Sequence, residues 1–165
     1  MAQVANKSSG RLTAILNGPT GLSNSLAAIS SRENVKLGEI APQHILPQNV
    51  APELAERTAG VKYPVYYVFC EKFTNQLREK FRTFSGKARL VVDVRVTHER
   101  LEELGRQLEL HAEAVTDVLD SHRGDWGGGI FYTGGYEVTF GGMKHGGKNF
   151  IQSAKVAFEV DVSIG

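Results

Sequence analysis

The chain has 165 residues, of which 41% are hydrophobic and 22% are charged, and its formal net charge at pH 7 is +1. These values are typical of a globular protein with one core, so we expect a single domain over residues 1–165. The chain lacks the excess of basic residues that is typical of a dedicated DNA-binding protein. No signal peptide and no run of about 18 apolar residues occurs, so we expect a cytoplasmic protein outside any membrane.

The first third of the sequence is expected to hold helices followed by an arm. Residues 1–10 are predicted to form a flexible N-terminus. Residues 11–29 have a helical apolar rhythm broken by Asn17-Gly18-Pro19, which predicts two short helices or one kinked helix. Residues 34–60 contain three prolines and predict an extended arm or loop, lying across a neighbour or across the protein's own sheet.

Two strands are predicted in the middle of the chain. Residues 63–73 are rich in aromatic and β-branched side chains, which favour a strand. Residues 88–96 alternate, with apolar side chains on one face and Arg89, Asp93 and Arg95 on the other, which predicts a half-buried strand with a wet outer face. The intervening residues 75–84 are mixed and locally basic.

Residues 97–121 are predicted to form the longest helix, with Thr97 as its N-cap and its end near Ser121. Its apolar stripe must pack on a sheet or helix, and His111 on that stripe is expected at the edge of the core. Residues 130–140 and 150–164 predict at least two further strands and an antiparallel hairpin. The element order predicts an α+β fold: a mainly antiparallel sheet with one long helix packed on one face, an N-terminal helical segment and an extended arm.

The sharpest motif covers Gly142 to Lys148, which fits the first seven positions of a phosphate-binding P-loop. A P-loop needs Ser or Thr after its lysine to hold magnesium, and a helix whose N-terminus faces the phosphates. Asn149 stands in the hydroxyl position, and an alternating strand pattern follows. We therefore favour a flexible hairpin tip over a nucleotide site.

The remaining candidates have ordinary structural explanations beside functional ones. Trp126 lies in a glycine-rich turn, where it is either an exposed interface anchor or a lid on the core. Cys70 lies in an apolar run and is expected to be a buried, inert thiol. The five histidines have no metal-ligand spacing, and no catalytic set is indicated. A basic set with interleaved phenylalanines is expected to be a solvated face, with phosphate contacts as the alternative: Arg78, Lys80, Arg82, Lys87 and Arg89, with Phe73, Phe81 and Phe84.

Three segments together resemble a known family. They are GKARLVVDVRV over residues 86–96, AEAVTDVL within the long helix at residues 112–119, and FEVDV at residues 158–162 after the glycine-rich hairpin. This order is similar to that of the tail terminator and tail completion (head-tail joining) proteins of long-tailed bacteriophages. The likeness extends from about residue 63 to the C-terminus.

The resemblance implies a structural virion protein, assembled in the host cytoplasm, that forms a homo-oligomeric and typically hexameric ring. Such a ring ends the polymerisation of the tail tube and joins it to the neck or connector, with tail tube protein and neck proteins as partners and DNA only passing through its lumen. It implies no enzyme, no catalytic residue, no cofactor, no metal and no membrane. The contacts with sister subunits or partners are expected to come from the arm and two loops. The expected contact residues are Pro47, Trp126, Phe131, Met143, Lys144 and His145.

Other functions stay open on the sequence alone. A tail tube or head-tail adaptor subunit is the nearest alternative. A nucleotide-binding enzyme that uses Gly142 to Lys148, and a nucleic-acid-binding module that uses Arg78 to Arg89, belong to different classes.

Overall fold

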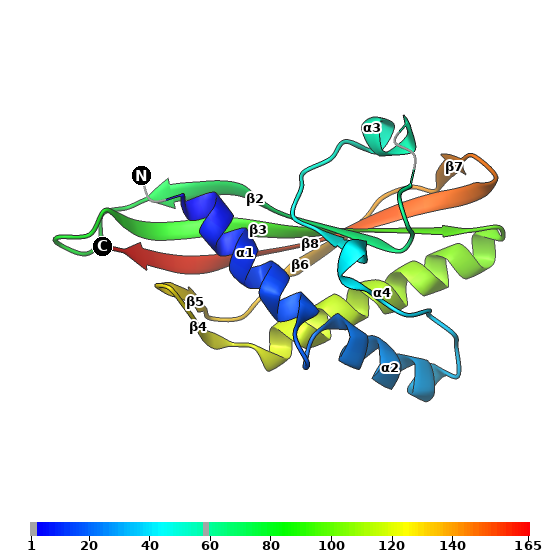
Figure 1. Cartoon of the computed structure of the whole chain (residues 1–165), viewed down its shortest axis with the longest axis horizontal. Coiled ribbons are helices and arrows are strands. Elements are labelled where there is room, and N and C mark those ends of the chain that lie inside the picture. The colour runs from blue at the N-terminus through cyan, green and yellow to red at the C-terminus, as the bar shows by residue number, and fades with distance from the viewer. Residues whose placement is uncertain (1–2, 58–59) are drawn as a thin grey trace.

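Three long strands form the centre of the protein in a computed structural model that describes residues 3–57 and 60–165. They are β2 (Val65–Asn75), β3 (Phe84–His98) and β8 (Asn149–Ile164). β3 lies between the other two and pairs with both in an antiparallel manner, in a sheet of order β1-β2-β3-β8-β5-β4 (Figure 1). The short β1 (Ile45–Leu46) adds to β2 in parallel, so the sheet is mixed but mainly antiparallel.

The second edge of β8 is covered by short strands instead of one long strand. β5 (Ile130–Tyr132), β6 (Glu137–Phe140) and β7 (Lys144–Gly146) pair with successive parts of β8, and β4 (Gly124–Gly127) adds outside β5. Gly134 and Gly135 separate β5 from β6 with positive φ angles of 105° and 87°. The single strand expected over residues 130–140 is therefore two, because backbone of this kind leaves the pleat of a strand.

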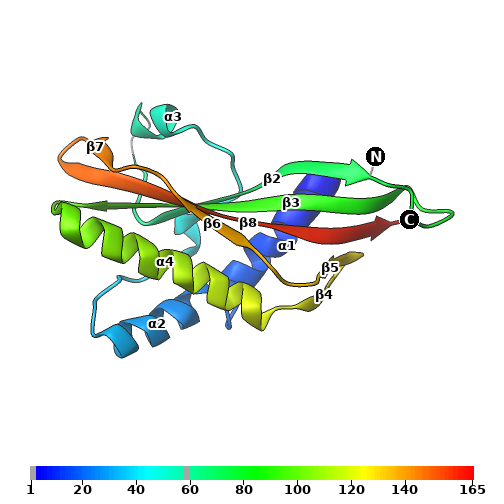
Figure 2. The ribbon, with the colours of Figure 1, turned by 180° about the vertical axis from the view of Figure 1, so that it is seen from behind.

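The helices pack on the sheet and on one another. α1 (Val4–Asn17) lies against β2 and β3, and α4 (Leu101–Ser121) lies along β3 and β8 (Figure 2). α2 (Leu22–Glu33) packs on α4, and Arg32 of α2 donates two hydrogen bonds of 2.8 and 2.9 Å to the Glu113 carboxylate. The α+β prediction is confirmed, and the pair of short helices expected around Asn17-Gly18-Pro19 is confirmed as α1 and α2.

Strand periodicity explains where the core lies. In β3 the side chains of Ala88, Leu90, Val92 and Val94 are fully buried and face the helices. They join one cluster with residues of the helices and of β8, including Leu12, Leu108 and Val156. An apolar face of this width needs a helical layer over it, which α1 and α4 supply together.

Two expectations at the ends of helices are wrong. Residues 4–10 are not a flexible N-terminus, because α1 begins at Val4 and buries Val4 and Ser8. Thr97 is not the N-cap of the long helix, because it pairs with Ile151 within β3, and Arg100 is the N-cap residue. The helix end near Ser121 is confirmed.

The arm lies across the protein's own sheet. Between residues 34 and 57 it forms a 3-10 turn (Pro42–His44), β1 and the short α3 (Pro52–Arg57). Leu37, Ile45 and Ala55 are buried along this path. The arm therefore packs on the protein's own sheet, which is one of the two alternatives that the sequence left open.

Candidate assembly interfaces

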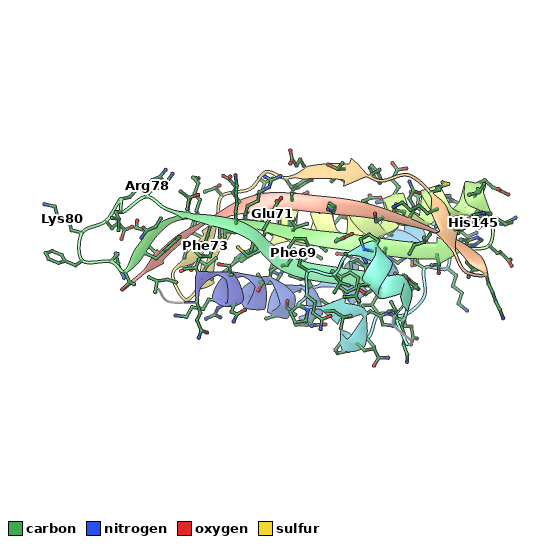
Figure 3. The ribbon with its side chains drawn as sticks, turned by 90° about the horizontal axis from the view of Figure 1, so that it is seen from above. Phe69, Glu71, Phe73, Arg78, Lys80 and His145 are labelled. Carbon is green, nitrogen blue, oxygen red and sulfur yellow. The ribbon has the colours of Figure 1, made fainter. Side chains whose placement is uncertain are left out.

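The hairpin that joins β2 to β3 ends in a projecting loop, residues 76–83, which we call the basic tip. Every residue of the basic tip is exposed. Phe81 is 101% exposed and Leu77 is 66% exposed, although both are large and apolar. Figure 3 shows Arg78 and Lys80 extending from one end of the elongated molecule, with His145 at the opposite end. Apolar side chains presented in this way are typical of contact surfaces.

The base of the basic tip is braced by hydrogen bonds. The Asn75 side-chain oxygen accepts bonds from the backbone N–H groups of Leu77 and Ser85, both at 3.2 Å. The Thr83 N–H donates to the Ile164 carbonyl at 2.8 Å, and the Ser163 hydroxyl donates to the Glu79 carboxylate at 2.9 Å. These bonds anchor the loop to β2, β3 and β8, and a loop anchored in this way would lose less entropy on binding.

The five basic residues singled out in the sequence divide into two groups. Arg89 pairs with Glu71 at 2.9 Å and with Glu137, and Lys87 pairs with Asp161 at 3.2 Å, so these two cations are neutralised on the sheet. The second group, in the basic tip, consists of Arg78, Lys80 and Arg82. Arg82 lies 3.3 Å from Glu79, the one carboxylate of the tip, which leaves the tip with a net positive charge.

The outer side of α4 has the opposite charge. The helix carries six carboxylates and one arginine over residues 101–121. Glu113 is paired with Arg32, and Asp120 lies 3.4 Å from Arg123. Glu102 and Glu109 are exposed, and neither forms an ion pair with any residue that the structure describes.

Trp126 is a lid on the core, one of the two interpretations that the sequence left open. Its ring packs on Tyr132 and Phe158, with centroid distances of 5.5 and 6.0 Å. Its indole N–H donates to the His122 carbonyl at 2.7 Å. The one polar atom of the side chain is thus satisfied inside the protein, and because the ring is only half-buried, its place in the interface set stays a prediction.

Phe131 is 47% exposed and lies beside the base of the basic tip. Arg78, Glu79 and Ser163 line the same groove, which has a volume of about 290 Å³. Although Phe131 and Arg78 are distant in sequence, pairing of β3 with β8 and of β8 with β5 brings them together.

The other predicted contact residues lie elsewhere. Met143, Lys144 and His145 are exposed at the β7 end of the molecule, where the His145 ring stacks on Phe150 at 5.1 Å. Pro47 is exposed on the arm. The predicted set therefore does not form one patch: Phe131 lies near the basic tip, the β7 residues lie at the far end, and Pro47 lies between elements of the arm.

The segment that fits a P-loop is a β-hairpin. Lys144 and Gly146 pair with Ile151 and Asn149 of β8, and the strand continues without a helix. Because a phosphate site of this type uses the N-terminus of the following helix, the backbone does not form one here. The hairpin interpretation is confirmed.

A buried ion pair lies under the arm where a wet strand face was expected. Arg95 and Asp93 of β3 are 2% and 5% exposed, and they pair at 2.9 Å. Arg95 also donates a hydrogen bond to the Val50 carbonyl of the arm. The expectation of a half-buried strand is wrong at this end of β3, because alternation in the sequence does not reveal that an arm returns to cover the polar face.

Two further titratable side chains have environments that differ from expectation. His111 is fully buried instead of lying at the core edge, and its Nδ1 lies 2.5 Å from the Tyr66 hydroxyl. Burial lowers the pKa of His111 to about 4 and raises the pKa of Tyr66. Cys70 is only half-buried, and burial raises the pKa of its thiol, so it remains protonated near neutral pH.

Clusters of three or more potential metal ligands are absent from the described residues. No helix among those residues has the length and apolar character to cross a membrane. No protein-family model matches the chain, and no curated protein matches it.

Proposed function

We propose that this chain is a structural subunit of a bacteriophage tail, which forms the ring that ends the tail tube and joins it to the neck. In this role it acts by shape and repeated contacts and carries out no catalysis. The partners are sister subunits, the tail tube protein and the neck or connector proteins. The DNA passes through the lumen of the ring, and the protein resides in the virion.

The observation that carries the proposal is the braced, projecting basic tip with its exposed Phe81 and Leu77. Phe81 and Leu77 together present two large apolar side chains on a loop anchored by hydrogen bonds, an arrangement that is explained if a partner covers them. The resemblance over residues 63–165 is the reason for proposing a phage tail ring as the assembly that provides that partner.

The shape of the molecule supports a cyclic assembly. The basic tip and the β7 hairpin lie at opposite ends of the long axis (Figure 1). A contact between two different surfaces of one chain is heterologous, and repetition of such a contact closes a ring when the rotation between copies allows it. Two chemically different ends of this kind allow such a heterologous contact.

The purified chain should be measured by light scattering after gel filtration, by native mass spectrometry and by negative-stain electron microscopy. The proposal expects a single closed ring, and it expects that adding the ring to polymerising tail tube protein limits tube length. Open stacks would instead identify a tube subunit, and binding to the portal side alone would identify an adaptor. A monomer at every concentration that also leaves tube length unchanged would contradict all three assignments.

A further inference from the structure

We infer that the basic tip of one subunit docks on the N-terminal half of α4 in the next subunit, where Phe81 covers an apolar spot and the tip cations face Glu102 and Glu109. This inference rests on the proposed ring function and names the contact that builds the ring. The argument uses exposure, charge and the position of both surfaces on one chain.

The two surfaces have complementary charges. Arg78 and Lys80 are exposed and make no ion pair within the described residues, and the same is true of Glu102 and Glu109. Because Glu102 and Glu109 are seven residues apart, they lie on the same side of the helix. Arg106 lies between them and is the one opposing charge on α4, so the attraction is reduced there but not cancelled.

An apolar spot lies beside these carboxylates. Leu101 is 44% exposed and Met143 is 42% exposed. Leu101 and Gly105 are neighbours on one face of α4 because they are four residues apart, and the Met143 methyl group would lie 3.3 Å from a Cβ placed on Gly105. The Met143 side chain therefore lies over Gly105, and together with Leu101 it forms a small exposed apolar surface that the ring of Phe81 would cover.

The positions of the surfaces require a second copy. In Figures 1 and 2, the start of α4 lies at the β7 end of the molecule and the basic tip lies at the other end. One subunit cannot therefore bring its own tip to its own helix. Since both surfaces occur in every copy, each subunit donates one tip and receives one, as a closed ring requires.

Leu77 favours a protein partner over nucleic acid. Bases stack on aromatic rings and cationic side chains attract phosphates, so Phe81 with Lys80 and Arg82 alone would suit either partner. Leu77 is exposed as well, and Glu79 places a carboxylate within the tip. An aliphatic side chain and a carboxylate contribute nothing to base stacking, and a carboxylate repels the phosphates of a nucleic acid.

The test is a charge swap between the two surfaces, read out by native mass spectrometry and light scattering at low salt. R78E/K80E and E102K/E109K should each weaken self-association by about tenfold or more, and the quadruple variant should recover most of it. K36E/K62E changes the same amount of charge as R78E/K80E at exposed sites on the arm side, and it should retain assembly. Phe81→Ser should weaken assembly without loss of folded structure by circular dichroism, because the side chain is fully exposed.

Several outcomes would overturn the contact. If the tip and helix variants assemble like the parent protein, the ring uses other surfaces, and the proposed function stands while this inference fails. If both variants lose assembly and the quadruple variant does not recover it, the surfaces do not face each other. If R78E/K80E leaves assembly intact but abolishes binding to a labelled 30-nucleotide DNA, the tip is a nucleic-acid contact. A parent chain that is monomeric throughout would remove the ring proposal itself.

Discussion

The guanidinium carbon of Arg95 lies 4.5 Å from the centre of the Tyr67 ring, within the sheet and beneath the arm. The same guanidinium donates to the Asp93 carboxylate at 2.9 Å and to the Val50 carbonyl. One buried cation therefore joins two strands of the sheet to the arm, and its charge is balanced by a carboxylate two residues away.

Replacing Arg95 with Met should destabilise the protein and loosen the arm. The variant removes the bond to Val50 and leaves Asp93 as a buried charge without a partner, a loss that typically costs about 3–5 kcal/mol. Chemical denaturation should show the drop in the free energy of unfolding. Hydrogen exchange should show faster exchange over residues 45–57 than in the parent.

The matched control is the double variant D93L/R95M, which removes both charges. It should recover part of the lost stability, because no unpaired charge then remains in the sheet. Faster exchange of the arm should persist, since the bond to Val50 is still missing. A double variant less stable than R95M alone would contradict this account of the pair.

The fold was predictable where periodicity carries the information. Alternation in residues 88–96 and 150–164 and the three-four spacing in α4 mark the apolar face of each element that packs in the core, so β3, β8 and α4 are predictable. The break within residues 130–140 was missed because Gly134 and Gly135 interrupt the strand through backbone angle and not through hydropathy. The apolar pattern predicts a helix only from residue 11, whereas α1 begins at Val4. The polar residues between Val4 and Leu12 conceal the helical spacing of its apolar side chains.

The candidate interface was harder to predict than the fold. The sequence shows the basic residues of the tip as a group. Whether they form a contact surface depends on their exposure, and their exposure depends on how far the β2–β3 hairpin projects from the sheet. Trp126 illustrates the same difficulty, because a glycine-rich turn leaves an exposed anchor and a lid on the core equally open, and only the folded turn shows the indole on Tyr132. Arg95 was misplaced because its covering segment lies about 45 residues away in the sequence.

The stability of the protein should fall as the pH is lowered from about 6.5 to about 4. Burial lowers the pKa of His111 to about 4 in the folded state, while the unfolded chain titrates near the ordinary value of 6.5. Between these values the unfolded chain binds more protons, so acid favours unfolding. The full contribution is present above pH 6.5, and roughly 3 kcal/mol is lost by pH 4. Urea unfolding at a series of pH values measures this slope.

His111→Gln separates this effect from the titration of carboxylates. Glutamine keeps an amide that can bond to the Tyr66 hydroxyl but does not titrate in this range. The difference between the two unfolding curves should therefore change with pH between 6.5 and 4 and be flat above 6.5. A difference that is constant over the whole range would mean that His111 has its ordinary pKa in the folded protein.

Gly86→Ala should disrupt the base of the basic tip. A Cβ on Gly86 would lie 1.9 Å from the Thr74 carbonyl oxygen, and the other nearest atoms are also backbone atoms, of Thr74 and Gln76, which cannot move aside as the end of a side chain can. Strain of this kind costs roughly 1–3 kcal/mol. Gly142→Ala is the matched control, because no atom lies within 4 Å of its added Cβ. Thermal unfolding should show a clear loss for the first variant and little change for the second.

Trp126 should matter for stability and not for assembly. Trp126→Ala removes contacts with Tyr132 and Phe158 and the bond to the His122 carbonyl, and truncation of a packed tryptophan typically costs about 3–5 kcal/mol. This figure is an upper estimate because the side chain is half-buried. Trp126→Phe keeps part of the packing and should assemble like the parent at temperatures where it is folded.

Phe131→Ser changes a half-exposed side chain beside the basic tip. In contrast to the Trp126 variants, it should lose little stability and should assemble more weakly. Denaturation curves and native mass spectrometry on the same samples give both quantities, and loss of assembly in a fully folded Trp126→Phe variant would show that Trp126 contacts a partner.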